Sequence, residues 1–398
     1  MSDIRMEEKR TKRRKRPDPD THKAVSKWNA LIFFGAIIVL DIIFLFSHGR
    51  LFSENENRML QQAPQLTMQS LTSGRYMTQF ESFISDQFAG RDGWIGAKLK
   101  MDRILGKKES NGVYLGGQGY LIEATAEPDT EALSRNLEAI NQFAAGHPRM
   151  KAVMTIVPNS SEINHALVPA GAPIRSQSED MAQITSQLSS DVVFADLLPV
   201  LTEHRSEPLY YRSDHHWTSL GASYAFPVIA QAMGFSEDDH YEIYQVADDF
   251  SGTMAATSGD FQVTDPVEIY IAQPEADYYV EYSGDPVKYS SVYSSAALEN
   301  KNKYEVFFGG NHPKITITTM SDTGRNLLVL KDSYANCFIP FLLPHFDHIM
   351  VVDPRYYSDD LETDLQSADI TDLLILYNEN TFVEDQSLAG VIAPDMEV

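Results

Sequence analysis

The feature that most constrains the fold is a regular alternation of short apolar runs with helix-forming segments from residue 130 onward. The apolar runs have the length and the turn-forming boundaries that are typical of buried strands. They are residues 152–157, 192–195, 326–330, 348–352 and 373–377. Helical segments are predicted before and between them, at residues 130–145, 179–189, 220–233 and 333–343, the last with a break at Pro340. This alternation predicts a parallel sheet with helices on both faces, which is a three-layer α/β/α sandwich.

Three other segments interrupt this pattern. Residues 49–110 carry apolar residues at helical spacing and predict a helical juxtamembrane region. Residues 111–122 predict two short strands around a glycine turn, at the start of a domain that spans residues 111–398. Residues 236–325 are rich in Tyr, Ser, Asp and Thr, and they predict a β-rich insertion that forms the rim of a substrate site.

The N-terminal segment predicts a membrane anchor. Residues 30–46 are almost entirely apolar, and at 1.5 Å per residue they extend about 26 Å, close to the lower limit for a bilayer span. Residues 1–27 contain ten Lys and Arg, so we expect this tail to stay cytoplasmic and the chain beyond the 28–48 signal-anchor to lie outside. A cleaved signal peptide is disfavoured because residues 46–50 contain no Ala-x-Ala cleavage site.

Charge and cysteine content limit the partners and the means of stabilisation. The net charge of the chain is −24, and the 22 basic and 50 acidic residues of the predicted exterior give that part −28. Such a field repels nucleic acids and other polyanions, but it admits a neutral or cationic glycan. The single cysteine, Cys337, excludes an intrachain disulfide and is expected to be a buried, small apolar residue. A large hydrophobic core must therefore stabilise the exterior.

The run Asp214-His215-His216-Trp217 is the strongest indication of chemistry. A carboxylate two residues from an imidazole can orient the ring, fix its tautomer and stabilise the imidazolium, as in a hydrolase or acyltransferase triad. A metal site and a polar turn are the alternatives from these residues alone.

Ser333 is the predicted nucleophile. It follows the strand at 326–330 and opens a helical segment, so its hydroxyl is expected at the carboxyl edge of the sheet, where open α/β folds bind ligands. The helix N-terminus would supply N–H groups for an oxyanion. A helix-capping serine occurs at the same kind of position and is the structural alternative.

Five further residues are candidates for oxyanion stabilisation or substrate binding. Asn378 follows another core strand and can donate through its amide, and Arg355 can bind an acyl carbonyl or a carboxylate. The remaining candidates adjoin the predicted triad and are Tyr334, His215 and Trp217. A turn residue, a surface ion pair and core packing are the respective structural alternatives for Asn378, Arg355 and Trp217.

Several motifs together resemble the DHHW protein family of Gram-positive bacteria, which is related to the SGNH-hydrolase-like alginate O-acetyltransferase proteins. The motifs are residues 53–58, 86–92, 112–116, 214–217 and 352–357. The resemblance covers nearly all of residues 50–398 and implies an SGNH-hydrolase-like domain in which the Asp-x-His pair precedes the serine. It implies Ser333 as nucleophile, His216 as base, Asp214 as orienting carboxylate and Asn378 as the block-three asparagine. Lys331 stands where the related proteins usually have glycine, which puts the oxyanion donors in question.

The resemblance also implies a function. We expect a membrane-anchored O-acyltransferase that acetylates a cell-surface polysaccharide and works beside a multispanning membrane-bound O-acyltransferase that supplies the acyl group. No cofactor and no metal are expected. A polysaccharide acetylesterase with the same residues, and a non-catalytic protein that binds glycans or acts as a scaffold, are the alternatives.

Overall fold

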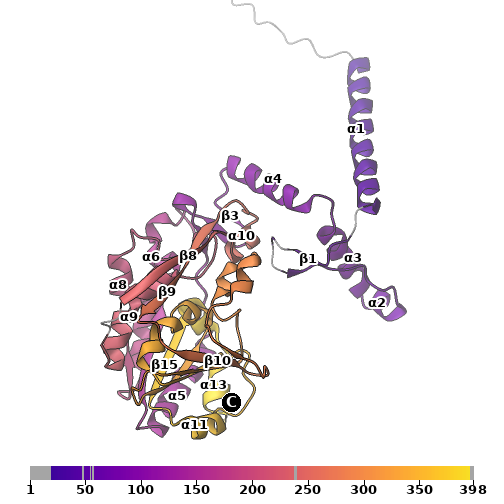
Figure 1. Ribbon diagram of the computed structural model, residues 1–398. Coiled ribbons are helices and arrows are strands. Elements are labelled where there is room, and N and C mark those ends of the chain that lie inside the picture. Colours follow the sequence, from indigo (N-terminus) through magenta and orange to yellow (C-terminus); the bar gives the residue numbers. More distant parts are fainter. Residues whose placement is uncertain (1–18, 47–48, 54, 56–57, 237–239, 395–398) are drawn as a thin grey trace, which may run out of the picture. The chain divides into compact units, whose positions relative to one another are not determined.

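The computed structural model describes residues 19–46, 49–53, 55, 58–236 and 240–394, so most of the predicted cytoplasmic tail lies outside the described residues. The chain divides into two compact units (Figure 1). One consists of residues 1–53 and 59–91, and the other of residues 54–58 and 92–398. Two-residue strands, β1 (Phe52–Ser53) and β2 (Arg58–Met59), lie near the division in the sequence.

The first unit contains the candidate membrane span. Helix α1 (Pro19–Phe46) includes a 22-residue stretch, Lys23–Phe44, with a mean hydropathy of 1.9, which is long and apolar enough to cross a membrane. The orientation of this helix remains a prediction. Two amphipathic helices follow, α2 (Met68–Thr72) and α3 (Arg75–Asp86), and a reciprocal capping box between Thr67 and Ser70 begins the first of them.

The second unit is built around an eight-stranded sheet within the described residues. Its order is β11-β10-β12-β14-β13-β15-β6-β7, with β14, β13, β15, β6 and β7 parallel and the other three antiparallel. The parallel strands are β6 (Lys151–Val157), β7 (Val192–Phe194), β13 (Asn326–Lys331), β14 (His348–Val352) and β15 (Asp372–Asn378). These are the five strands that the apolar runs predict.

Both faces of this sheet are covered, as the alternation predicts. Alternate residues of a strand point to opposite faces, so Val329 and Leu374 pack in one core, with α8 (Leu198–Glu203) and α9 (Ser219–Met233). Leu328 and Ile375 pack in the other core. The helices of that core are α5 (Thr130–Gly146), α7 (Gln177–Gln187), α11 (Leu361–Ala368), α12 (Glu379–Glu384) and α13 (Leu388–Ile392). The three-layer α/β/α class is confirmed.

The segment 236–325 is β-rich, and it contributes to the main sheet. Its β8 (His240–Phe250) and β9 (Asp265–Gln273) pair with each other, with α10 (Thr253–Ser258) between them. Its β10 (Tyr278–Tyr282), β11 (Lys288–Tyr289) and β12 (Lys314–Thr319) extend the sheet beyond β14. Two 3-10 helices, η3 (Ser295–Glu299) and η4 (Lys303–Val306), lie between β11 and β12.

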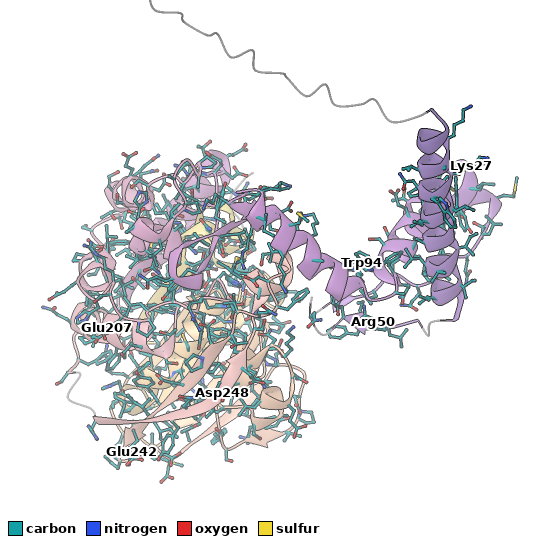
Figure 2. The ribbon with its side chains drawn as sticks, turned by 90° about the horizontal axis from the view of Figure 1, so that it is seen from above. Lys27, Arg50, Trp94, Glu207, Glu242 and Asp248 are labelled. Atoms are coloured by element: carbon teal, nitrogen blue, oxygen red, sulfur yellow. The ribbon has the colours of Figure 1, made fainter. Side chains whose placement is uncertain are left out.

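Shorter elements complete the second unit. They are α4 (Arg91–Ile104), β3 (Glu109–Ser110), β4 (Val113–Leu115), η1 (Gly117–Gly119), β5 (Leu121–Glu123), α6 (Ser160–Ile163) and η2 (His165–Leu167). Glu242 and Asp248, two of the acidic side chains, are exposed on β8 (Figure 2).

The helical segment predicted at residues 333–343 is interrupted near Pro340, as expected, but both of its parts are 3-10 helices rather than α-helix. Two 3-10 helices occupy this region, η5 (Ser333–Cys337) and η6 (Ile339–His345). Pro340 and Pro344 have no N–H to donate, so a continuous α-helix cannot form there. Ser333 therefore opens a helix too short to provide the strong helix dipole expected from the sequence.

Candidate active site

Two loops bring the predicted catalytic side chains together. Strand β13 ends at Lys331, and Ser333 follows it after one intervening residue, Asp332, at the carboxyl edge of the parallel strands. The loop before α9 carries Asp214 and His216, and an antiparallel bridge between Tyr210 and Trp217 closes it. Both loops are anchored by buried elements, so the separation of these side chains is fixed by the fold.

Asp214, His216 and Ser333 form a continuous hydrogen-bonded chain. Nε2 of His216 lies 2.8 Å from Oγ of Ser333, and Nδ1 of His216 bonds to Oδ1 of Asp214. A carboxylate accepts, so the Nδ1 atom carries the proton and Nε2 presents a lone pair to the serine hydroxyl. Asp214 and His216 are buried, whereas Ser333 is partly exposed. This is the geometry that a nucleophile, a base and an orienting group require, and their catalytic roles remain a prediction.

The second carboxylate oxygen of Asp214 is held by the insertion. Oδ2 accepts from the backbone N–H of Thr253 at 2.7 Å and from its Oγ1 at 2.9 Å. Burial alone would raise the pKa of Asp214, but the electrostatic interactions with His215 and His216 and the hydrogen bonds from His216 and Thr253 outweigh this effect and lower that pKa. Asp214 therefore stays ionised, as an orienting carboxylate must.

Gly252 allows this close approach. A Cβ atom placed on Gly252 would lie 2.3 Å from both Cβ and Oδ2 of Asp214, far inside van der Waals contact. Any larger residue would therefore displace either the Asp214 carboxylate or the backbone that donates to it. The sequence 250–254 carries no local signal of this role, because the contact joins residues from different segments.

Tyr304 is a further site residue that the sequence does not reveal. Its ring stacks on that of His216, with centroids 3.9 Å apart and an interplanar angle of 15°. Its hydroxyl donates to the backbone carbonyl of Ser333 at 2.9 Å. Tyr304 thus contacts both the imidazole ring of His216 and the backbone of Ser333, and these two contacts help to fix the position of the ring relative to the serine.

Trp217 and Tyr334, two of the predicted substrate-binding residues, lie in the core, which is the structural alternative given above for Trp217. Both side chains have 0% exposure, so neither is accessible to a sugar. Trp217 donates from Nε1 to the carbonyl of Tyr334 at 2.8 Å, and the Tyr334 hydroxyl donates to the carbonyl of His215. Through these two hydrogen bonds, Trp217 and Tyr334 link the loop that carries His216 to the turn that carries Ser333. Cys337 is buried as predicted.

The amide of Asn378, the predicted oxyanion donor, makes its hydrogen bonds within the protein. Its Nδ2 atom donates to Asp332 and, at 2.7 Å, to Thr381, while Oδ1 caps α12 through the N–H of Thr381. The backbone N–H of Tyr334 also donates to Asp332, at 2.8 Å. Asn378 therefore holds the Asp332 side chain that shapes the turn at Ser333. Asparagine commonly caps helix N-termini, so the residue type alone does not distinguish a capping role from a catalytic one.

Lys331 and Arg355 share a buried carboxylate. Asp353 accepts from Arg355 at 2.8 and 2.7 Å through both of its oxygens, and Lys331 Nζ lies 3.3 Å from one of them. Lys331 is fully buried, and burial lowers the pKa of its ammonium group. Burial would also lower the pKa of Arg355, but the Asp353 hydrogen bonds and charge raise it. The Lys331 ammonium is thus paired with Asp353, the neighbour that also orients Arg355.

An open cavity of about 570 Å³ adjoins these residues. His215 and Arg355 line it together with Glu123, Thr253 and Asn380. Nδ1 of His215 lies 2.7 Å from Oγ1 of Thr253, and burial, then the nearby His216, lower the pKa of His215. Of the predicted substrate-binding residues, His215 and Arg355 are therefore the two placed where a ligand can reach them.

A buried polar network lies behind this cavity, and sequence reasoning missed it. Gln177 donates from Nε2 to Asn159 at 3.0 Å and to Glu379 at 2.5 Å. Asn159 in turn donates to the Tyr334 hydroxyl at 3.1 Å. Burial, followed by the neighbouring Asp180, raises the pKa of Glu379 to about 9, so this carboxyl is protonated at neutral pH.

The grouping of Asp214, His215 and His216 also matches the spacing of metal ligands, with ligand atoms within 4.8 Å of one another. Both ring nitrogens of His216 are, however, already engaged by Asp214 and Ser333. Oδ2 of Asp214 is bound by Thr253. A metal ion bound through His216 would have to replace one of these hydrogen bonds, so the donor set fits a triad better than a metal centre.

Comparisons with known proteins agree with this architecture. The family model described as DHHW protein matches residues 149–352. A DHHW family protein from Eubacterium siraeum has a solved structure with 24% identity and a TM-score of 0.61, covering 72% of this chain and 96% of its own. PatB1 from Bacillus cereus, solved with a sulfonyl adduct, has 17% identity and a TM-score of 0.56, covering 69% and 98%. These likenesses establish the shared fold. No curated protein matches the chain.

Proposed function

The chain belongs to the DHHW protein family, and from this premise we propose that it is a membrane-anchored O-acyltransferase that acetylates a cell-surface polysaccharide. The observation that carries the proposal is the 2.8 Å contact between Oγ of Ser333 and Nε2 of His216, whose other nitrogen bonds to Asp214. A serine in hydrogen-bond contact with an oriented, neutral imidazole is an activated nucleophile.

In the first half-reaction, Oγ of Ser333 attacks the carbonyl carbon of an acyl donor, and Nε2 of His216 takes the hydroxyl proton. Asp214 stabilises the resulting imidazolium. The bond between the carbonyl carbon and the leaving group then breaks, and the imidazolium returns its proton to that group. The product is an acyl ester on Ser333.

In the second half-reaction, a sugar hydroxyl attacks this ester, and His216 takes its proton as base. The ester bond to Oγ breaks, the serine recovers the proton, and the acyl group is transferred to the sugar. Charge develops on the carbonyl oxygen in both half-reactions. We assign Arg355 to that oxygen or to a nearby substrate carbonyl, because Asp353 fixes its guanidinium and it lines the cavity beside His215.

The source of the acyl group follows from the compartment. With residues 1–27 in the cytoplasm and the catalytic domain outside, acetyl-CoA is not available to Ser333. A multispanning membrane-bound O-acyltransferase is the proposed partner that carries the acyl group across the membrane, and helix α1 would hold this protein beside it.

Water in place of a sugar in the second half-reaction would make the protein a polysaccharide acetylesterase. The partial exposure of Ser333 supports this second candidate, because water can reach an acyl group bound there. A scaffold that only binds glycan would need none of the hydrogen bonds among Asp214, His216 and Ser333.

The test uses the full-length protein in detergent with p-nitrophenyl acetate as donor, with and without an oligosaccharide. We expect acetyl on Ser333 by mass spectrometry and its transfer to the sugar, whereas free acetate alone would support the esterase. Methanesulfonyl fluoride should modify Ser333 and block both. Ser333→Ala should abolish turnover, and Ser367→Ala, on α11, should leave it unchanged. Unchanged turnover by Ser333→Ala would refute both enzymatic functions.

A further inference from the structure

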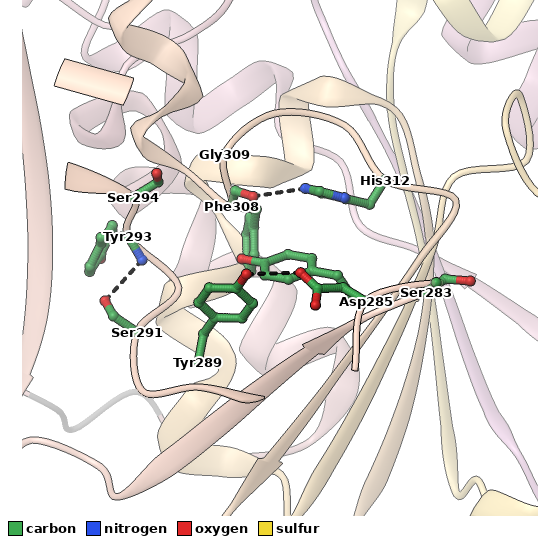
Figure 3. A pocket seen from close by; sticks show the side chains of 11 residues that line it. Ser283, Asp285, Tyr289, Ser291, Tyr293, Ser294, Phe308, Gly309 and His312 are labelled. Carbon is green, nitrogen blue, oxygen red and sulfur yellow. Dashed lines mark hydrogen bonds between the residues drawn. The ribbon is translucent and has the colours of Figure 1, made fainter. Parts of the chain in front are cut away.

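A second pocket lies in the insertion, separate from the cavity beside His215 (Figure 3). Its volume is about 420 Å³, within the range of roughly 300–1,000 Å³ typical of small-molecule sites. The end of β10, the turn that follows it, β11 and two loops from residues 291–294 and 308–312 line it. Nothing in the proposed acyl transfer uses this pocket.

Flat aromatic rings form much of its wall. The Tyr282 ring meets Tyr289 edge-on at 5.3 Å between centroids and lies 4.3 Å from the ring of His312. Tyr289 is 41% exposed, so its ring is accessible from solvent. Tyrosine combines an apolar face with a polar edge, which suits a ligand that has apolar C–H faces and a rim of hydroxyl groups. A pyranose ring is such a ligand.

Polar groups surround these rings. The Tyr289 hydroxyl donates to Oδ2 of Asp285 at 2.8 Å, which fixes the carboxylate at the pocket (Figure 3). Nε2 of His312 lies 2.9 Å from the Phe308 carbonyl, so it carries the ring proton and leaves Nδ1 as an acceptor. Burial lowers the pKa of His312, and the nearby charge of Lys331 acts in the same direction, although the hydrogen bond to the Phe308 carbonyl opposes it. Acceptors of this kind bind sugar hydroxyls.

The loop on one side of the pocket is strained. Phe308 has φ 64°, and Gly309 and Gly310 follow with φ 73° and 112°. A bulky residue in this region is strained and persists only where its surroundings hold it. Here the Phe308 N–H donates to Val292 at 2.8 Å, and its carbonyl accepts from His312. These hydrogen bonds hold the strained loop, and with it this wall of the pocket, in one conformation, as preorganised binding sites require.

The same loop reaches the triad. Tyr304, a few residues before Phe308, stacks on His216 and donates to the Ser333 carbonyl. Asn311, just after the glycines, accepts from Asn336 at 3.1 Å and lies 3.4 Å from Lys331 Nζ. Residues 304–312 therefore contact both the pocket and the segment on each side of Ser333.

We propose that this pocket is a glycan-binding subsite that takes one uncharged pyranose unit of a polysaccharide, stacked on Tyr289 and hydrogen-bonded to Asp285 and His312. The carboxylate of Asp285 and the strongly acidic exterior select against uronic acids and other anionic sugars. The binding itself does not depend on acyl transfer. The identification of this sugar as part of the acceptor polymer rests on the proposed function.

The test measures binding of defined tetrasaccharides to full-length Ser333→Ala protein in detergent, by ligand-observed NMR. The probes are β-1,4-linked glucose, β-1,4-linked N-acetylglucosamine, α-1,4-linked glucose and, as the anionic control, α-1,4-linked galacturonate. We expect at least one neutral probe to bind with a Kd on the order of 1 mM or below, and galacturonate to bind at least about tenfold more weakly.

Variants locate the binding. Tyr289→Ala should weaken it by about tenfold or more, Tyr289→Trp should retain it, and Tyr244→Ala, which removes a similarly exposed tyrosine on β8, should have no effect. The inference is overturned if no neutral probe binds, if Tyr289→Ala binds like its parent, or if galacturonate binds best. Sugar binding without acetyl transfer would refute the proposed function alone, and acetyl transfer with unchanged kinetics in Tyr289→Ala would remove the acceptor role alone.

Discussion

Replacing Gly252 with alanine should strongly reduce kcat for acetyl-ester turnover while the protein remains folded. The new Cβ would lie 2.3 Å from Cβ and Oδ2 of Asp214, so the carboxylate or the Gly252-Thr253 backbone must move by about 1.1 Å to restore ordinary contact. Either movement disturbs the hydrogen bonds from Thr253 that fix Oδ2 at 2.7 and 2.9 Å. Misplacement of a catalytic group by about 1 Å costs roughly a hundredfold in rate, which corresponds to about 2.7 kcal/mol of transition-state stabilisation.

The assay compares kcat for acetyl-ester turnover with the thermal midpoint of unfolding, using the full-length protein. We expect kcat of Gly252→Ala to fall about a hundredfold, while overpacking lowers stability by about 1–3 kcal/mol and leaves the protein folded at 25 °C. Gly146→Ala is the matched control. It adds the same methyl group at the end of α5, where nothing lies within 4 Å, and it should preserve kcat. A Gly252→Ala protein with wild-type kcat would show that Asp214 need not occupy this position.

Four further predictions test the site. Asp214→Asn should reduce kcat by about 10⁴-fold with little change in the melting temperature, because an amide nitrogen cannot accept from Nδ1 of His216; near-normal kcat would exclude Asp214 as the orienting group. Thr253→Val should lower kcat about tenfold and Thr253→Ser much less, because only the valine removes the 2.9 Å hydroxyl contact, and equal effects would contradict this role. Because the pKa of Glu379 is about 9, the folded state holds a proton that the unfolded state releases above about pH 4.5, so the free energy of unfolding should fall by up to about 1.4 kcal/mol per pH unit towards pH 9. Glu379→Gln should flatten that decline in urea titrations at several pH values. An unchanged slope would show that Glu379 is not the group responsible. Prolonged treatment with EDTA should leave acetyl-ester turnover intact, whereas loss of turnover that zinc restores would favour a metal at Asp214, His215 and His216.

The sequence predicts the part of the site that follows from regular structure. Ser333 ends a parallel strand, and the carboxyl ends of such strands share one edge of the sheet, so its position could be anticipated. The spacing of Asp214 and His216 likewise predicts their mutual contact. For Asn378 and Trp217 the sequence leaves two roles open, because a capping amide and a buried indole have the same residue types as an oxyanion donor and a sugar platform. Only burial and hydrogen-bond partners distinguish these roles.

Thr253 and Tyr304 could not be predicted, because their contacts join segments far apart in the chain. Thr253 lies 39 residues from Asp214, and Tyr304 lies 29 residues from Ser333. Both belong to the segment 236–325, where irregular connections between strands leave little periodicity to interpret. The contacts of such segments are set by tertiary packing rather than by local sequence.

The involvement of this segment explains how a buried carboxylate can be tolerated at the site. A buried charge without partners costs several kcal/mol, and Asp214 avoids that cost by accepting from the backbone and ring of His216 and from the backbone and hydroxyl of Thr253. Two of these four donors come from the insertion. The insertion also pairs β12 with β14, so the edge of the parallel strands is covered only when it is in place. A protein without the insertion would therefore lose two of the four donors to Asp214 and expose a sheet edge at the same time, so the insertion supports both the predicted triad and the main sheet.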